Sequence, residues 1–522
     1  MMPASNRFVA QPGLLDVRQL QRRDHGNSFY PKRSSPLCLW KNSMALTPLA
    51  DFFRNFMVLR RTASPGCHAD PDVAAEQHDA GRGHDAREPG PLRRVFQNAG
   101  LLLGSQGLAG VCGVAALALA ARVLGSEQFG ILILIHAYAL VVATVVRFNG
   151  WYAVIRYGTM CLSEGRRSDL QGVIRFTSLL DAGGAAVGAL GAVAAAPLLG
   201  PWLGWQDVIE LGQLYSLTII FNAVDTPMGI LRLFDRFDLI AWLRLCSPAC
   251  RCLGAIAAFA LGGDLRVFLT IWFVAEVADA VLLWGFAVRE LARRGYLAGM
   301  SFTVRGLSRP HPGIWRLLWS TNLNSTLGMV LGRMTTLVLG SALGPASAGF
   351  YSVATQFAAV FDRPVEMLRR TIYPELSRLS AVADVAAMRG LAVRSGLLVG
   401  TIMVPLVLVV ATFAEWVLAL VMGEGYIAAA TVLSWLMVRQ AILAFGFPLG
   451  LMLVSLGQAT ALLKVNLVTS MLYVALLMAS LSLWGLDGAG IAAAAAAALA
   501  TVLSGTVVAR IVRLGPGAAI TT

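Results

Sequence analysis

The stretch that decides the fold is LAARVLGSEQFGILILI (119–135), because the chain repeats its pattern once, as LVLGSALGPASAGFYSVA (337–354). Each copy has an apolar segment, Leu-Gly, four further residues, a second glycine and another apolar segment. The glycines after Leu124 and Leu343 are 344 − 125 = 219 positions apart. Glycine allows a tight turn between two long apolar segments. A period of this length is far beyond a solenoid unit, so it predicts a duplicated half-protein that folds as two similar bundles.

The composition is that of a membrane protein with many spans. Of the 522 residues, 57% are hydrophobic and only 14% are charged, whereas soluble proteins carry about 25% charged residues. The net charge is +13, but the basic residues lie between apolar segments and not on one compact face. We therefore expect no nucleic-acid partner. The seven cysteines show no spacing typical of disulfides or metal ligands, and we expect neither a metal nor a cofactor.

Apolar segments of membrane length follow one another from Val95 onward. About 20 apolar residues cross the ~30 Å hydrocarbon core of a bilayer. The sequence therefore predicts an all-α polytopic membrane protein, with about twelve transmembrane helices in two pseudo-symmetric six-helix lobes around a central cavity. The expected spans are 96–121, 130–152, 174–197, 208–230, 241–262, 267–288, 315–340, 348–370, 392–414, 426–454, 459–482 and 488–511.

The expected organisation has five parts. Residues 1–94 are polar, rich in Arg, His, Pro and Asp, and have no apolar periodicity. They are interpreted as a disordered cytoplasmic extension, or as the result of a start site assigned too far upstream. The remaining parts are an N-terminal lobe at 95–290, a cytoplasmic linker at 291–314, a C-terminal lobe at 315–513 and a short cytoplasmic tail at 514–522.

Basic residues predict the orientation. Arginines gather in the loops after the second, fourth, sixth and eighth spans, and the alternate loops carry almost none. The positive-inside rule therefore places both termini in the cytoplasm. The outward loops are short, and the sequence has no nucleotide-binding loop or metal-protease motif. We expect no catalytic residues. Because there is no nucleotide-binding motif, an ion gradient or the substrate concentration must drive any transport.

Arginines inside the predicted spans are the candidate binding residues. A charge at the centre of a span costs at least ~2.5–3.5 kcal/mol, so it normally faces a cavity or a partner. Asn322 and Arg333 are eleven residues apart, about three helical turns, and Asn324 adds to this polar stripe. Arg147 and Arg439 complete the predicted set. Because a guanidinium stays charged and forks onto phosphate oxygens, the set suits an anionic substrate group. The alternative for the Asn-rich stripe is hydrogen bonding between packed helices.

Four acids inside spans are candidates for ion or proton coupling: Asp181, Asp225, Glu276 and Asp279. Glu276 and Asp279 are three residues apart and share a helix face. Asp225 precedes Thr226-Pro227, where an interrupted helix is expected to line water. Structural ion pairs with arginines are the alternative for these acids.

Six short segments carry a resemblance to a known family. They are LAARVLGSEQFGILILI, FNGWYAVIRYG (148–158), LRLFDRFDLIA (231–241), WSTNLNSTLG (319–328), LGPASAGFYSVATQFA (343–358) and IYPELSRL (372–379). With them, the chain over about 95–513 resembles the Wzx-type polysaccharide repeat-unit flippases, also called lipopolysaccharide biosynthesis proteins. These belong to the multidrug/oligosaccharidyl-lipid/polysaccharide (MOP) exporter superfamily.

The resemblance implies the substrate and the partners. The protein would move polyprenyl-pyrophosphate-linked oligosaccharide repeat units from the cytoplasmic to the outer leaflet by alternating access, for O-antigen or exopolysaccharide synthesis. The pyrophosphate would lie against cavity arginines, the lipid tail among membrane lipids, and a polymerase or export machinery would act next. Family patterns often place an acid after the arginine of span seven, but here Met334 follows Arg333, which leaves this arginine less restrained.

Three other functions stay open. A drug/cation or other small-molecule antiporter of the same superfamily would have an acid-dominated cavity in the first lobe, and the four acids keep that alternative alive. A membrane enzyme such as a polysaccharide polymerase or ligase would need a sizeable outward loop, which the sequence lacks. A non-transporting scaffold in an export complex is the third.

Overall fold

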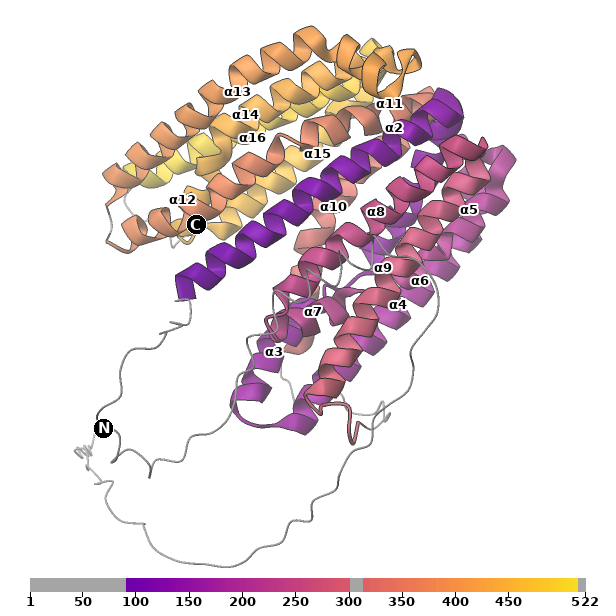
Figure 1. The fold of residues 1–522 in the computed structure, drawn as a ribbon. Coiled ribbons are helices and arrows are strands. Elements are labelled where there is room, and N and C mark those ends of the chain that lie inside the picture. Colours follow the sequence, from indigo (N-terminus) through magenta and orange to yellow (C-terminus); the bar gives the residue numbers. More distant parts are fainter. Residues whose placement is uncertain (1–90, 301–312, 383, 515–522) are drawn as a thin grey trace, which may run out of the picture. The chain divides into compact units, whose positions relative to one another are not determined.

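The structure, a computed structural model, describes residues 91–300, 313–382 and 384–514, and these residues are organised as helices joined by short turns (Figure 1). The expectations for residues 1–90, 301–312 and 515–522 lie outside the described residues. The N-terminal lobe consists of α2 (Pro91–Val146), α3 (Trp151–Ser163), α4 (Arg167–Trp202), η1 (Gln206–Val208), α5 (Ile209–Ser216), α6 (Thr218–Phe221), α7 (Asp225–Leu233), α8 (Phe237–Leu261) and α9 (Leu265–Arg293).

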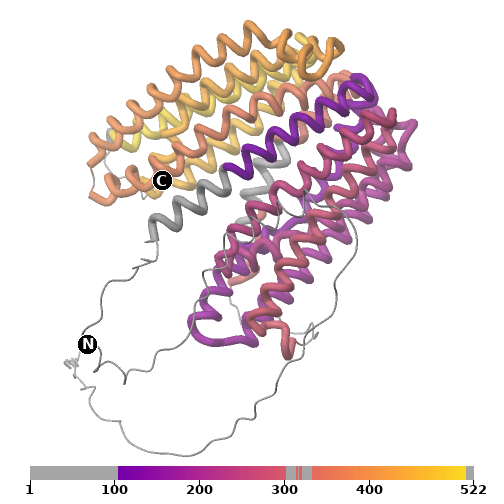
Figure 2. The backbone as a smooth tube through the Cα atoms, viewed as in Figure 1, coloured from indigo at the N-terminus to yellow at the C-terminus, as the bar shows by residue number. Residues whose placement is uncertain are grey.

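The C-terminal lobe consists of α10 (Ile314–Leu343), α11 (Pro345–Ala359), α12 (Asp362–Ala381), α13 (Val385–Met422), η2 (Glu424–Ala429), α14 (Ala430–Ser455), α15 (Ala459–Trp484) and α16 (Leu486–Leu514). Figure 2 shows the two bundles with the indigo part of α2 running between them. Helix α2 packs against α8 of its own lobe and against α10 and α11 of the other lobe.

Apart from the eighth, the predicted spans coincide with helices that are continuous or broken, and the all-α, two-lobe membrane fold is confirmed. Among the described residues, nine stretches are long and apolar enough to cross a membrane. The first, Gly104–Ser163, includes most of the span predicted at 96–121 and all of the span predicted at 130–152. The continuous span predicted at 348–370 is wrong in detail, because helix α11 ends at Ala359 and α12 begins at Asp362. Helix α12 is rich in charged residues, so its polar faces suit water better than lipid.

The bends of the two lobes match in position and in backbone conformation. Gly125 (φ 70°, ψ 175°) interrupts α2, and Gly344 (φ 89°, ψ 168°) separates α10 from α11. A second pair of positive-φ glycines, Gly204 and Gly423, is again 423 − 204 = 219 residues apart. A positive φ is accessible to glycine at little cost. The same conformation at the same period in both lobes supports the duplication predicted from the repeat.

The end of each lobe that carries these four glycines, called the glycine end, is where the lobes make close contact. Gly130 on α2 lies against the backbone of α11: a Cβ on Gly130 would lie 2.0 Å from the carbonyl oxygen of Pro345. The matching glycine of the other lobe, Gly349, packs on Phe129 and on the Gly130 backbone. Because only hydrogen fits between these backbones, glycine at the repeated position sets how closely the two lobes approach.

Polar contacts add to the packing at the glycine end. The Arg122 guanidinium on α2 donates to the Val421 carbonyl (3.1 Å) and to the Leu420 carbonyl at the end of α13. These belong to the carbonyls that the last turn of a helix leaves without partners. The Tyr426 hydroxyl of η2 donates to the Gly125 carbonyl (3.2 Å), and its ring packs edge-on against Phe129, with centroids 5.7 Å apart. The glycine end is therefore sealed by backbone contact, aromatic packing and hydrogen bonds between the lobes.

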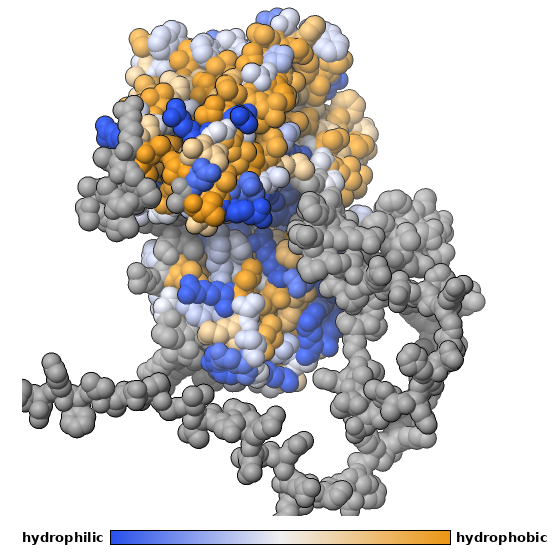
Figure 3. All heavy atoms as spheres, turned by 90° about the vertical axis from the view of Figure 1, so that its left-hand side faces the viewer, coloured by the Kyte–Doolittle hydropathy of each residue, from blue (hydrophilic) through white to orange (hydrophobic). Residues whose placement is uncertain are grey.

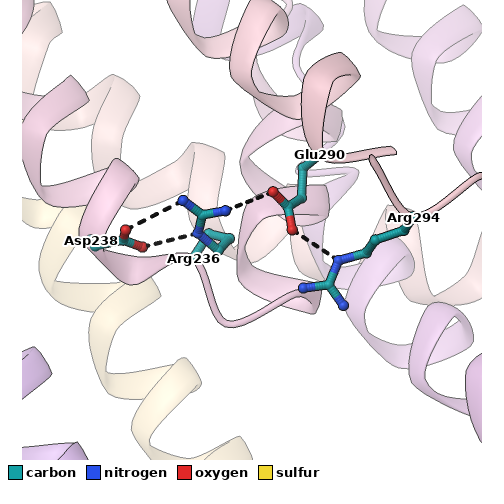
Figure 4. A network of polar contacts seen from close by, with 4 residues as sticks. All are labelled: Arg236, Asp238, Glu290 and Arg294. Atoms are coloured by element: carbon teal, nitrogen blue, oxygen red, sulfur yellow. Dashed lines mark hydrogen bonds and ion pairs between the residues drawn. The ribbon is translucent and has the colours of Figure 1, made fainter. Parts of the chain in front are cut away.

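An ion-pair network fastens the N-terminal lobe where the α7–α8 turn meets the end of α9 (Figure 4). Buried Glu290 accepts from Arg236 (2.7 Å) and from Arg294 (2.8 Å), and Arg236 also contacts Asp238 (3.2 Å). Two guanidinium groups neutralise the buried carboxylate, which could not remain ionised there alone. The network joins two turns of this lobe and lies apart from the contact between the lobes.

Substituting Gly130 with Ala tests the backbone contact. A methyl group at this position must push α2 and α11 apart, and we expect the variant to lose about 1–3 kcal/mol of stability. The measurement is the melting temperature of the purified protein in detergent.

Gly191→Ala is the matched control, since Gly191 also lies inside a helix but has open space around it. That change should leave the melting temperature equal or slightly higher, because Ala favours helix by about 1 kcal/mol over Gly. Equal melting temperatures for the two variants would contradict the close contact of the lobes at Gly130.

Candidate functional site: an arginine-lined cavity between the lobes

A cavity of about 680 Å³ lies between the lobes. On α2 its lining runs from Gln106 to Leu117 and resumes at Ile133 to Ala137, so the sealed glycine end separates the two lining segments. Its basic side chains come from four helices of both lobes: Arg244 and Arg251 of α8, Arg333 of α10, Arg363 of α12 and His136 of α2. Among the described residues, no carboxylate lines this cavity. It is therefore a cationic chamber suited to an anionic ligand.

Arg333 is a cavity arginine without a carboxylate partner among the described residues. Its side chain is exposed to the cavity beside Gly332 and Thr336. Within the part of the chain that the structure describes, no ion pair involves it. A charge without a protein partner attracts an oppositely charged ligand.

Arg251 is held differently. It forms an ion pair with Glu276 of α9, and its guanidinium lies 4.7 Å from the centre of the Trp272 ring. Its Nε atom is buried and has no hydrogen-bond partner among the described residues. Such an orphaned donor costs free energy until something accepts from it. Arg251 is therefore oriented by Glu276 and Trp272 while one of its donors remains unused.

His136 completes the wall next to Arg251. Its Nδ1 lies 2.7 Å from the Tyr215 hydroxyl, and its ring meets the Trp272 ring edge-on, with centroids 4.9 Å apart. These contacts fix the orientation of the imidazole at the cavity surface. The cavity wall at this point is built by α2 and α9, and Tyr215 of α5 supports the imidazole.

Arg363 of α12 forms a contact between the C-terminal lobe and α2. Its Nη1 donates to the Gln106 carbonyl (2.8 Å). A Cβ on Gly110 would lie 2.5 Å from this guanidinium, so glycine makes room for it. Arg363 thus spans the two lobes at a place away from the glycine end.

Arg147 lies outside the cavity, in the N-terminal lobe. Its Nε donates to Asp225 Oδ2 (2.6 Å) and its second nitrogen contacts the other oxygen, so the pair is bidentate. Asp181 accepts from the Thr226 backbone and hydroxyl (2.8 and 2.7 Å). The expectation of an unneutralised Arg147 is thus not met, because Asp225, 78 residues away, supplies the countercharge.

A break between two helices lies next to Arg147. Helix α2 ends at Val146 and α3 begins at Trp151, with Asn149 at φ 50° between them. The break lies at Asn149-Gly150. Asp225 begins α7 after a short non-helical turn, as the Asp-Thr-Pro segment predicts.

The other predicted residues are divided between locations. Arg439 lies in a second cavity, inside the C-terminal lobe. Glu276 is paired with Arg251, and Asp279 lies about one turn further along the same helix. Asn322 is buried, and the side chain of Asn324 lies outside the described residues. Of the predicted arginines, the main cavity therefore contains Arg333.

Sequence reasoning missed four basic residues of the cavity: Arg244, Arg251, Arg363 and His136. Arg251 did stand out as a charge inside a span, but its neighbours are cysteines and gave no sign of a cavity. Arg244 and Arg363 looked like loop residues that orient the chain. A helical-wheel comparison of spans five and eight would have been the available signal.

The outer surface fits a lipid environment. Large hydrophobic side chains are widely exposed, among them Leu261 (86%) and Trp202 (78%). On the face drawn in Figure 3, hydrophobic side chains dominate the upper bundle, and hydrophilic ones gather in the hollow beneath it. Lipid-facing apolar groups around a polar interior are what a transporter requires.

Solved structures share this fold. An inward-facing multidrug resistance MATE family transporter of the MOP superfamily superposes with a TM-score of 0.61 at 12% identity, covering 80% of this chain and 96% of that one. The lipid II flippase MurJ, in an inward closed conformation, also gives a TM-score of 0.61 at 12% identity, covering 78% and 87%. The predicted MOP-exporter fold is confirmed.

Sequence comparison gives the family. The inner membrane protein YghQ of Escherichia coli (strain K12) is 31% identical over 341 residues, which are 65% of this chain and 96% of that protein. A family described as polysaccharide biosynthesis protein matches residues 118–431. The resemblance noted in the six sequence segments is thereby confirmed, and the chain belongs to the polysaccharide biosynthesis protein family.

Proposed function

We propose that the protein translocates polyprenyl-pyrophosphate-linked oligosaccharide repeat units across the inner membrane by alternating access. The observation that carries the proposal is the cavity between the lobes, with four arginines and no carboxylate among its described lining residues. A pyrophosphate has several ionised oxygens, and guanidinium groups bind such oxygens with paired hydrogen bonds. Family membership and the transporter fold support the same conclusion.

The chemistry of the substrate explains why binding needs this cavity. The lipid tail can stay in the bilayer, but a charged pyrophosphate at mid-bilayer must keep polar partners. Arg333 and Arg251 offer guanidinium donors that need an acceptor, and the nearby hydroxyls of Thr336 and Ser352 can donate to further oxygens. Movement then consists of opening the cavity on one side and afterwards on the other.

The conformation described here has the glycine end closed. With the orientation that the basic loops predict, this end faces the periplasm, and the cavity would load from the cytoplasm. Transport would then require the lobes to separate at Gly130 and Gly349 and to lose the hydrogen bonds of Arg122 and Tyr426. Together these contacts form a gate that can close again in the same register.

The antiporter alternative depends on the acids of the N-terminal lobe. Asp225 is paired with Arg147, Glu276 with Arg251, and Asp181 accepts two hydrogen bonds from Thr226. These contacts favour structural roles for the acids. A cation carrier would instead lose activity mainly on substitution of Asp181 or Asp225 by its amide, with Arg333 dispensable.

Replacing Arg333 with Ala should abolish surface polysaccharide while protein levels stay normal, because the substrate phosphate loses its unpaired guanidinium. The measurement is surface polysaccharide on intact cells, together with the amount of lipid-linked intermediate that accumulates inside. Arg333→Lys should restore part of the surface polysaccharide, since lysine returns the positive charge but cannot form the paired hydrogen bonds of a guanidinium.

Arg389→Ala is the control for this prediction, since Arg389 is an exposed arginine of α13 that does not line the cavity. It should leave the polysaccharide unchanged. Wild-type output from Arg333→Ala would remove this residue from the mechanism.

The predicted orientation is tested by truncation fusions. A fluorescent-protein fusion after Gly295 should fluoresce and an alkaline phosphatase fusion there should be inactive, because this position lies on the arginine-rich side. After Gly485 the two reporters should behave in the opposite way. The reverse pattern at both sites would overturn the cytoplasmic placement of the termini.

A further inference from the structure

The second cavity, of about 460 Å³ within the C-terminal lobe, has one charge of each sign among its described lining residues. Arg439 of α14 is the positive charge, and Asp362, the first residue of α12, is the negative one. Within the described residues, neither side chain has an ion-pair partner. Opposite charges that line one space of low dielectric attract each other. The cavity therefore separates two groups that could form an ion pair.

Arg439 is oriented by one neutral contact. Its Nη1 donates to the side-chain oxygen of the neighbouring Gln440 (3.2 Å). Gln440 is itself held in place, because its amide donates to the Ala358 carbonyl at the end of α11 (3.3 Å). A guanidinium has five N–H donors, and a neutral amide does not cancel its charge. Arg439 thus has a defined position and still lacks a countercharge among the described residues.

The Asp362 carboxylate is exposed, and the space beside it is unfilled on the side of α14. It lines the second cavity and also a smaller one, of about 260 Å³, between α12 and α14. Two other charged residues of α12, Glu366 and Arg369, line only the smaller cavity. Glu366 is paired with Arg370 (3.3 Å). The first turn of α12 therefore has room to approach α14, and Asp362 is the charge that it would bring toward Arg439.

The junction between α11 and α12 allows this turn to move. Helix α11 ends at Ala359, and α12 begins at Asp362. Pro364 has no N–H to donate to the Val360 carbonyl, so the hydrogen bonding of a continuous helix is interrupted here. The two residues between the helices donate to carbonyls only three residues back. A bend at this junction can redirect the first turn of α12 without unfolding either helix.

Arg363 holds the same turn on the side of the main cavity. Its Nη1 donates to the Gln106 carbonyl on α2 (2.8 Å), and Gly110 leaves room for its guanidinium. Successive residues of a helix point about 100° apart. Arg363 therefore lines the main cavity, whereas its neighbour Asp362 lines the second one. One turn of helix thus carries a contact that is made, to α2, and a charge without a partner, beside α14.

We propose that Asp362 and Arg439 are a positioning pair for Arg363, and that they form an ion pair in a second conformation of α12 in which Arg363 has released α2. The two contacts compete for one turn of helix. An anionic ligand in the main cavity favours the second conformation, because it offers Arg363 a stronger acceptor than a backbone carbonyl. The ion pair then keeps the turn close to α14 while Arg363 is bound to the ligand.

The inference rests on the proposed function, in which the ligand is the pyrophosphate of the substrate, and it adds a consequence of binding. The contact between Arg363 and Gln106 joins the two lobes at a place away from the glycine end. Loading of the main cavity would break this contact and fill part of the second cavity. Binding between the lobes would thereby change the packing inside the C-terminal lobe.

Disulfide trapping tests the second conformation on the purified full-length protein in detergent. Asp362→Cys and Arg439→Cys are combined, diamide is the metal-free oxidant, and peptide mass spectrometry quantifies the disulfide between positions 362 and 439. The rate is measured in this double variant, with Arg363→Gln added, and with Arg370→Gln added. Arg370 is the matched control, since it lies on the same helix, is exposed and is paired with Glu366. Gel filtration verifies that each variant is folded.

We expect Arg363→Gln to raise the rate of disulfide formation at least fivefold, because the contact with α2 is lost, and Arg370→Gln to leave the rate unchanged. Inorganic pyrophosphate should raise the rate while Arg363 is present and have no effect after its replacement. Absence of the disulfide, or a rate that Arg363→Gln does not change, would overturn the second conformation. A response to Arg363→Gln without a response to pyrophosphate would support the pair and count against the phosphate ligand of the proposed function.

Charge reversal tests whether the pair matters for transport. Asp362→Arg and Arg439→Asp each place like charges in one cavity, and each should lower surface polysaccharide on intact cells at least tenfold. The double variant has one charge of each sign again and should recover at least half of the wild-type amount. If Arg439 instead acted alone, the double variant would be as low as Arg439→Asp, and that result would exclude the pair. Immunoblots verify that the variants reach wild-type protein levels.

Discussion

The constraint on which this structure depends is that a charge within a membrane needs a partner or water. The N-terminal lobe meets it with carboxylates: Asp225 neutralises Arg147, and Glu276 binds Arg251. Arg333 and Arg439 have no ion pair in the described parts of the chain, and each lines a cavity. Pairing therefore fixes Arg147 within its lobe and leaves Arg333 and Arg439 available to a ligand, whereas Arg251 is oriented by Glu276 and still keeps one unused donor in the cavity.

Duplication explains how such a cavity can open on either side. The two lobes carry glycines of like conformation at a spacing of 219 residues, so they meet through equivalent surfaces. A contact made of backbone, rings and a few hydrogen bonds can break and re-form without exposing a buried charge. The fixed charges of the N-terminal lobe lie inside the lobe and need not change partners when the lobes move.

Much of the fold could be predicted from the sequence, because the length of an apolar segment and the backbone conformation that glycine permits are local properties. The twelve spans and the turn at Gly125 follow from such local rules. The interruption at Ala359 was missed, since hydropathy continued through it into the start of α12. The sequence could indicate that an arginine in a span needs a partner, but it could not indicate whether that partner is protein or ligand.

The candidate site shows the same limit. Arg333 lines the cavity and has no ion pair in the described parts of the chain, and its role in binding stays a prediction. Arg147 was predicted to join it, but its partner Asp225 comes from another helix and is adjacent only after folding. Arg363 could not be assigned to the cavity, because its place there depends on the space that Gly110 leaves on the opposite lobe.

The link that Arg122 makes across the glycine end has a consequence for how this contact varies in evolution. Its acceptors are the main-chain oxygens of Leu420 and Val421, which every amino acid at those positions would supply. The contact therefore requires one particular side chain, that of Arg122, on the N-terminal lobe. On the C-terminal lobe it requires only the position of the backbone. The lipid-facing side chains at the end of α13 can therefore change without loss of the hydrogen bonds from Arg122.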